Sequence, residues 1–198
     1  MKRKLTIIAT ILLFCATISA QTKDEELKYA NYYIQQGQFD KALAICDKYP
    51  NDAKALVVKY ACYTTQGDEK KAFLCAKQSA QLGFSFAMQI VGYAYQYGMG
   101  TPVDYVQAIK YFELLLKSEQ GDDYFKGIAF LNIAVSYYHL DYANTAAYWL
   151  DQYNVLYAHA TTDVRAQLKQ KEHICEDIIP SIKGDITKTT FSIEDINK

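Results

Sequence analysis

The 198-residue chain contains little proline, glycine or tryptophan, with three, nine and one of these residues respectively. So little proline and glycine excludes a collagen-like chain and argues against a disordered one. The hydrophobic fraction of 51% instead predicts a single well-packed core. A formal net charge of −1 gives no electrostatic reason to expect a nucleic-acid partner, since nucleic acids normally require a basic surface.

Sequence motifs of the common catalytic and metal sites are absent as well. The chain contains no G-x-S-x-G, no H-E-x-x-H and no C-x-x-C, which are the patterns of many serine hydrolases, zinc proteases and thiol or zinc sites. His173 and Asp177 lie one helical turn apart, but a structural metal needs about four ligands and no others are visible. We therefore expect no catalytic residue, no metal, no cofactor and no enzymatic activity.

No apolar run reaches the about 20 residues that a membrane-spanning helix needs. The longest run, residues 5–18, follows basic residues at positions 2–4 and precedes the small residue Ala20. This order is typical of a secretory signal peptide. We predict that residues 1–20 are removed by cleavage after Ala20 and that the mature chain is periplasmic or secreted. Membrane contact is then expected only through the signal peptide or through a partner in the cell envelope.

Two alternatives to a cleaved signal peptide remain open. In the first, the apolar segment is an uncleaved membrane anchor. In the second, a lipid is attached at Cys15; this is less favoured because bulky Phe14 stands where a lipoprotein signal has a small residue.

Four cysteines follow the predicted signal peptide: Cys46, Cys62, Cys75 and Cys175. They lie within apolar helical patterns, so we expect them to pack as small buried side chains. An exported protein can also form disulfides. Cys62 and Cys75 are the first pair to consider, because the helices that carry them should be adjacent; the sequence leaves open whether they bond.

What the sequence does contain is a helical pattern that repeats. From residue 24 to residue 179 the apolar residues recur with the period of a helix, and no sustained alternation predicts a strand. Gly37 and Gly67 each end a helix, where a residue free to adopt positive φ is favoured. Each is followed five residues later by an alanine, Ala42 or Ala72. Such an alanine lets two helices approach closely.

The third unit, "GYAYQYGMGTPVDYVQAIKYF", spans residues 92–112. Gly98 and Gly100 are expected to form an extended turn, and Asp104 to cap the next helix. Residues of this unit that we expect in the packing between its helices are Gly92, Ala108, Tyr111 and Phe112. A fourth, shorter unit has "HLDYAN" in place of the glycine turn, and its Ala146 and Trp149 match Ala108 and Tyr111.

The third unit resembles a Sel1-like repeat, a branch of the tetratricopeptide-type helical repeats, through its two turn glycines, the aspartate, the alanine and the aromatic pair. It departs from the family pattern at Thr101, where valine is usual, and at Gln107, where lysine is usual. The two earlier units look like plainer tetratricopeptide repeats. The resemblance implies an all-α fold, a right-handed α-solenoid of about four antiparallel helix hairpins, which binds partner proteins or peptides without catalysis.

The predicted organisation is a repeat domain over residues 21–160, a C-terminal capping helix over 161–180 and a polar tail over 181–198. Solenoids need a terminal helix with a polar outer face, and "RAQLKQKE" supplies one. Pro180 is expected to stop this helix. The tail is either a frayed end or a strand that pairs elsewhere, and the sequence does not decide between them.

In such a solenoid the first helix of each hairpin lines the concave side. Positions one turn apart on these helices therefore form the candidate groove, and they are Asn31, Gln35, Gln89, Tyr93, Gln96, Tyr97, Tyr138 and His139. Leu131 and Val135 occupy lining positions in the fourth unit. Tyrosines and amides suit peptide recognition, although any of these rings can instead pack against the neighbouring helix. Lys28 lacks a basic companion, so capture of a C-terminal carboxylate is not expected.

The sequence therefore predicts an exported, non-enzymatic adaptor or scaffold of the bacterial cell envelope that binds a protein or peptide. The alternative is a cell-wall-associated enzyme or an enzyme-regulating module. Convergent carboxylates or a serine–lysine pair in a pocket would favour the enzyme, and a long open groove with exposed tyrosines would favour the adaptor.

Overall fold

The computed structural model describes residues 22–118, 122–172 and 178–184. Every regular element in these ranges is a helix, which confirms the predicted all-α class. The predicted signal peptide, the residues His173, Cys175 and Asp177, and most of the predicted tail lie outside the described residues.

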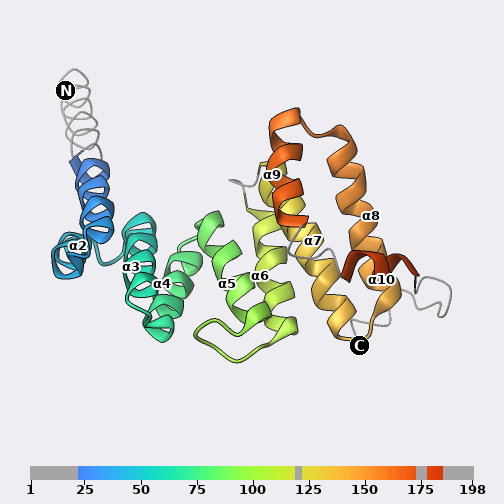
Figure 1. Cartoon of the computed structure of the whole chain (residues 1–198), viewed down its shortest axis with the longest axis horizontal. Coiled ribbons are helices and arrows are strands. Elements are labelled where there is room, and N and C mark those ends of the chain that lie inside the picture. Colours follow the sequence, from blue (N-terminus) through green and yellow to red (C-terminus); the bar gives the residue numbers. More distant parts are fainter. Residues whose placement is uncertain (1–21, 119–121, 173–177, 185–198) are drawn as a thin grey trace, which may run out of the picture.

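The described helices form four successive hairpins that stand side by side as an α-solenoid (Figure 1). From α2 to α8, helices that follow one another along the chain pack against each other, and the first helices of the third and fourth hairpins also touch. The four hairpins consist of a helix over residues 22–35 (helix 22–35) with α2 (Phe39–Cys46), α3 (Ala53–Thr65) with α4 (Glu69–Gln81), α5 (Ser85–Tyr97) with α6 (Tyr105–Lys117), and α7 (Asp123–His139) with α8 (Ala143–His159).

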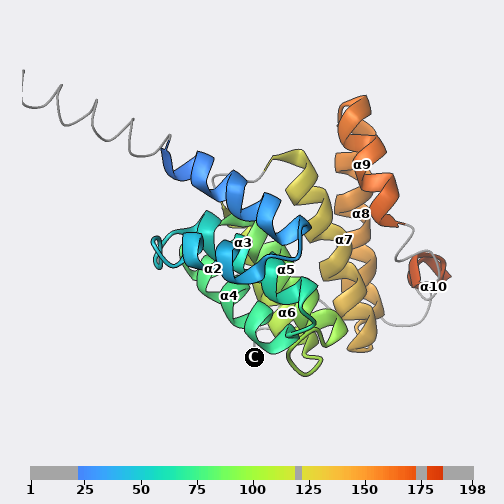
Figure 2. The ribbon, with the colours of Figure 1, turned by 60° about the vertical axis from the view of Figure 1, so that its left-hand side comes forward.

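Two further helices, α9 (Thr162–Glu172) and α10 (Ile178–Gly184), cover the C-terminal end of the stack. Helix α9 lies against α7 (Figure 2). Helix α10 contacts α8 and α7. The contact of α9 depends on Leu168, which is fully buried over Gly127 of α7. A Cβ atom on Gly127 would lie 2.7 Å from the Leu168 side chain, so only glycine leaves room for this close contact.

The expectation that Pro180 ends the capping helix is wrong, because Pro180 lies inside α10, in its first turn. A proline is tolerated there since the backbone N–H groups of a first turn have no partner within the helix. Proline therefore marked the start of a helix here and not its end.

Aspartates cap four of the repeat helices. Asp104 accepts a hydrogen bond from the backbone N–H of Gln107 at 2.9 Å and so caps α6. Asp52, Asp68 and Asp122 cap α3, α4 and α7 in the same way. These caps satisfy backbone donors that the helices leave free.

The tight turns of the hairpins share one backbone conformation. Gly37 and Gly67 have φ values of +69° and +76°, in the left-handed region. In the fourth hairpin Asp141 takes this position with a φ of +64°. Aspartate tolerates the region better than most residues but less well than glycine. The segment "HLDYAN" thus makes the same short turn as the first two hairpins, without their glycine.

The third hairpin packs differently, because a large aromatic ring fills the space between its helices. Phe112 of α6 is fully buried, and a Cβ atom on Gly92 of α5 would lie 2.7 Å from its ring. In its long turn, Gly100 has a φ of +71° and approaches the backbone of Glu69 at the start of α4. Small buried alanines mark the crossing points of all four hairpins: Ala42, Ala72, Ala108 and Ala146.

Candidate functional site

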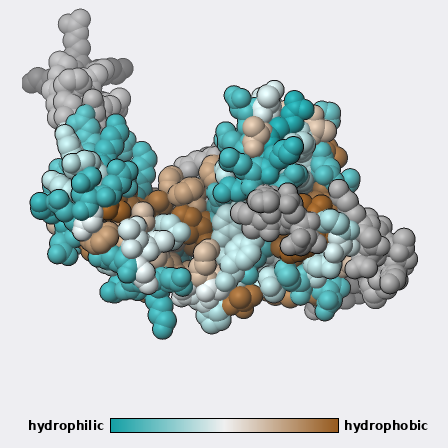
Figure 3. Space-filling model, viewed as in Figure 1, coloured by the Kyte–Doolittle hydropathy of each residue, from teal (hydrophilic) through white to brown (hydrophobic). Residues whose placement is uncertain are grey.

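The stack is hollowed where helix 22–35, α3 and the start of α5 meet, on the side that the first helices of the hairpins form. The hollow has a volume of about 390 Å³. Figure 3 shows apolar surface over α3 and α5 in a notch of this face, with polar surface around it. The hollow is lined by Asp24, Leu27, Lys28, Asn31, Lys54, Val57, Val58, Phe84 and Phe86. We call it the N-terminal hollow.

Apolar side chains make the floor of the N-terminal hollow. Leu27 and Val58 are buried, Val57 and Phe84 are half-buried, and Phe86 leaves 44% of its surface exposed. Exposed apolar area of this kind, rimmed by polar residues, is typical of an interaction surface.

Charged side chains make the rim. Lys54 binds both carboxylate oxygens of Asp24 at 3.1 Å, and both side chains remain about half exposed. Lys28 is exposed one turn along from Asp24 and forms no ion pair with any described residue. The rim therefore carries one positive charge more than it carries negative charge.

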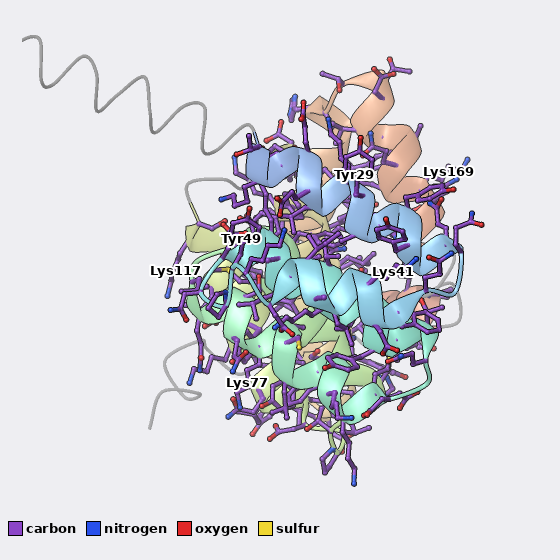
Figure 4. All side chains as sticks on the ribbon, turned by 90° about the vertical axis from the view of Figure 1, so that its left-hand side faces the viewer. Tyr29, Lys41, Tyr49, Lys77, Lys117 and Lys169 are labelled. Atoms are coloured by element: carbon purple, nitrogen blue, oxygen red, sulfur yellow. The ribbon has the colours of Figure 1, made fainter. Side chains whose placement is uncertain are left out.

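Two of the predicted groove residues belong to this part of the molecule. Asn31 is exposed and lines the N-terminal hollow, and Gln35 is exposed one turn further along the same helix. Figure 4 looks onto this end of the stack, with helix 22–35 and α2 nearest the viewer and Tyr29 on the outer side of helix 22–35.

The predicted tyrosines of α5 lie at different depths. Tyr97 is 46% exposed, and its ring centre lies 6.0 Å from that of Tyr93. Tyr93 is half-buried, because its ring packs edge-on against Phe112 and its hydroxyl accepts a hydrogen bond from Asn132 of α7 at 3.4 Å. Of these two rings, that of Tyr97 offers more exposed surface to a partner.

Gln89 and Gln96 do not line an open groove, which corrects the prediction for both residues. They are buried, with only 4% and 3% of their surfaces exposed. They share a side of α5 with Tyr93, whose hydroxyl meets α7, so they face the neighbouring helix. Repeat periodicity gives the side of the helix but does not say how close the next hairpin comes.

Two polar residues on the facing side of α7 were missed by sequence reasoning. Asn132 and Ser136 are buried one turn apart; the Asn132 amide donates to the Ile128 carbonyl at 2.7 Å. Oε1 of Gln89, the amide group of Gln96 and Oγ of Ser136 have no hydrogen-bond partner among the described residues. The only sequence signal was the presence of polar residues at helical spacing within an otherwise apolar helix.

The fourth hairpin offers less surface than predicted. Leu131 and Val135 are almost fully buried, because α9 packs against α7 as an additional first helix would. Tyr138 is half-buried, and exposed His139 stacks on Tyr105 of α6 with ring centres 4.7 Å apart and planes 9° from parallel. Trp149, half-buried on α8, contacts Phe130 of α7. Of the lining positions predicted on α7, only His139 is exposed.

A second hollow, of about 710 Å³, lies between the α3–α4 turn and the α5–α6 turn. Its lining includes the glycines Gly67, Gly98 and Gly100 and the carboxylates of Asp68 and Glu69. Asp68 is already engaged, since it caps α4 and binds Lys71 at 2.8 Å. The hydrogen bond from Lys71 holds the pKa of Asp68 below its ordinary value, so this carboxylate is an ionised cap.

The cysteines among the described residues pack within the helical stack. Cys46 and Cys62 are fully buried, Cys75 is half-buried, and all three are free thiols. Burial raises the pKa of Cys46 to about 11. Helices α3 and α4 are adjacent as expected, but Cys62 and Cys75 are not joined.

Neither a metal site nor a membrane span is found in the part of the chain that the structure describes. No group of three or more histidine, cysteine or acidic side chains in these residues is arranged to hold a metal ion. None of their helices is long and apolar enough to cross a membrane.

Two segments of the chain match the family model of the Sel1 repeat, residues 63–84 and 85–117. The second match is the unit whose glycines, aspartate and aromatic pair carried the resemblance. The first corresponds to the unit that looked like a plainer tetratricopeptide repeat. No curated protein is significantly similar to the chain.

Proposed function

We propose, from its two Sel1 repeats, that the chain is an exported adaptor that binds a partner protein or peptide on its concave side. Sel1 repeats are commonly protein-interaction modules and typically non-enzymatic scaffolds. The observation that carries the proposal here is the N-terminal hollow, an open surface with an apolar floor formed by three successive lining helices.

Binding is tested by capture from cell-envelope extracts with the purified chain as bait. Phe86→Asp places a charge on the apolar floor and should reduce recovery of a specific partner at least tenfold, as for the loss of an interface hot spot. The matched control is Leu74→Asp on α4, an outer helix, where the leucine is also exposed. Equal recovery by both variants and the unchanged chain would reject the concave side as the binding surface.

The export part of the proposal rests on the basic and apolar start of the sequence. Intact-mass measurement of the protein recovered from the periplasm or the medium should give a chain that begins at Gln21. A mass that retains residues 1–20, or one that includes a lipid on Cys15, would contradict it.

A further inference from the structure

We propose that the N-terminal hollow binds an acidic amphipathic segment of the partner, with one apolar side chain on Phe86 and Val57 and an aspartate or glutamate side chain at Lys28. This inference rests on the proposed function and deepens it, because it selects one end of the concave side and one kind of partner.

The apolar half of the inference follows from the floor. Phe86 and Val57 come from the first helices of different hairpins and lie exposed or half-buried in one hollow. A volume of about 390 Å³ accommodates a few side chains and no folded domain. A segment that places one large apolar side chain there would remove both floor residues from water, and such burial of apolar surface is favourable.

The acidic half follows from the rim. Asp24 already binds Lys54, so the one carboxylate of the hollow is neutralised, whereas Lys28 has no ion-pair partner among the described residues. A carboxylate from the partner completes the rim by pairing with Lys28 and adding to the Lys54 pair. A basic segment would instead meet an unbalanced positive charge, and like charges across an interface disfavour binding.

The start of α5 adds to this preference. Its N-cap residue, Phe84, lines the hollow and supplies no side-chain cap, whereas α3, α4, α6 and α7 all have aspartate caps. Among the described residues, no side-chain cap offsets the partial positive charge at this end of α5.

The test selects binders from a displayed library of random peptides. The C-terminal end of each peptide is amidated or lies within a longer chain, so that no peptide offers a free C-terminal carboxylate. Selection is carried out on the purified full chain. We expect the selected peptides to combine a large apolar residue with aspartate or glutamate. Lys28→Glu should weaken their binding by about tenfold or more and should shift a new selection towards lysine and arginine.

The matched control is Lys110→Glu, which makes the same charge change at an exposed position on the outer helix α6. It should leave peptide binding unchanged, and melting curves of both variants establish that the fold is intact. Peptides without acidic enrichment, or peptides bound equally by the Lys28 and Lys110 variants, would overturn the inference.

Two outcomes separate this inference from the proposed function. In the first, the peptides bind the Lys28→Glu and Phe86→Asp variants normally but lose affinity for Tyr97→Ala. This result would support a binding surface on the concave side and reject the N-terminal hollow as its location. A library that yields no specific binder at all, together with unchanged partner capture by Phe86→Asp, would reject both.

Discussion

The first two hairpins and the third hairpin solve the same packing problem with different side chains. In the first hairpin and α3, the buried cluster consists mainly of small residues, among them Ala30, Ala55, Cys46 and Cys62, whereas Phe73 of α4 already belongs to the larger cluster. In the third, large rings fill the interior, and glycine stands wherever a ring or a backbone comes too close for a side chain. Two helices can approach closely when both carry small residues at the contact. They can also do so when a small residue on one helix faces a large residue on the other.

The comparison extends to the two hydrophobic clusters. The cluster of the first hairpins is separate from the larger one, which begins at Phe73 and continues to Ile182 in the C-terminal cap. The first hairpins therefore have less buried apolar side chain to hold them. The N-terminal hollow lies across this boundary, since Leu27 and Val58 belong to the smaller cluster and Phe84 packs on the larger.

The largest effect is expected for Phe112→Ala, which empties the interior of the third hairpin. Because Phe112 is fully buried, the loss should be about 3–5 kcal/mol of unfolding free energy. The matched control is Leu114→Ala on the same helix, where the side chain is 41% exposed; it should cost far less. Urea unfolding followed by circular dichroism measures both, and similar losses would show that Phe112 is not the centre of this packing.

A smaller loss is expected for Gly92→Ala. The new methyl group would lie 2.7 Å from the Phe112 ring, so the ring or the helices must shift, at a cost of about 1–3 kcal/mol. In the double variant Gly92→Ala with Phe112→Leu the smaller side chain should recover part of that loss. Strictly additive losses in this double-mutant cycle would contradict direct contact between the two positions.

In the short turns, two substitutions should change the unfolding free energy in opposite directions. Gly67→Ala forces a residue with a Cβ atom to keep a φ of +76° and should cost about 1 kcal/mol. Asp141→Gly in the fourth hairpin relieves a φ of +64° and should raise the unfolding free energy by about 0.5–1 kcal/mol. Thermal melts of both variants test this; a loss of stability for Asp141→Gly would show that the aspartate side chain has another role.

The smallest effect is expected in how stability depends on pH in the acidic range. The pKa of Asp68 is lowered from its ordinary 3.8 by Lys71, so its stabilising contribution is present above the unfolded-state pKa. That contribution is lost as the pH falls below about 4 and through the folded-state pKa. Urea midpoints measured from about pH 6 to about pH 3 should therefore fall less steeply for Asp68→Asn, which keeps a capping oxygen but does not titrate. Identical pH dependence in both proteins would assign the acid effect to other carboxylates.

Much of the architecture was predictable because it depends on local chemistry. Gly37, Gly67 and Asp104 act through their own backbone conformation or a partner three residues away, and such interactions are visible in sequence spacing. The same is true of the helical period and of the third repeat, with its two glycines and aromatic pair. The wrong prediction for Pro180 shows the limit of such local signals. Proline suits the first turn of a helix as well as the residue after its end.

The candidate surface was only partly predictable. Asn31 and Tyr97 are exposed on lining helices, but Gln89 and Gln96 are buried against α7, and Leu131 is covered where α9 returns. Phe86 and Lys54 were not singled out, since nothing in their local sequence distinguishes an apolar or basic residue in a hollow from one in a core or on an outer face.

By itself the sequence determined the helices, their turns and caps, and the order of the hairpins, because these follow from periodicity and from residues close together in the chain. Only the tertiary structure decided which lining positions remain open and that Lys28 has Lys54 and Phe86 as neighbours in one hollow. The reason is physical: exposure depends on how closely successive hairpins approach, and that distance is set by side chains that meet from different helices, such as Gly92 and Phe112 or Gly127 and Leu168.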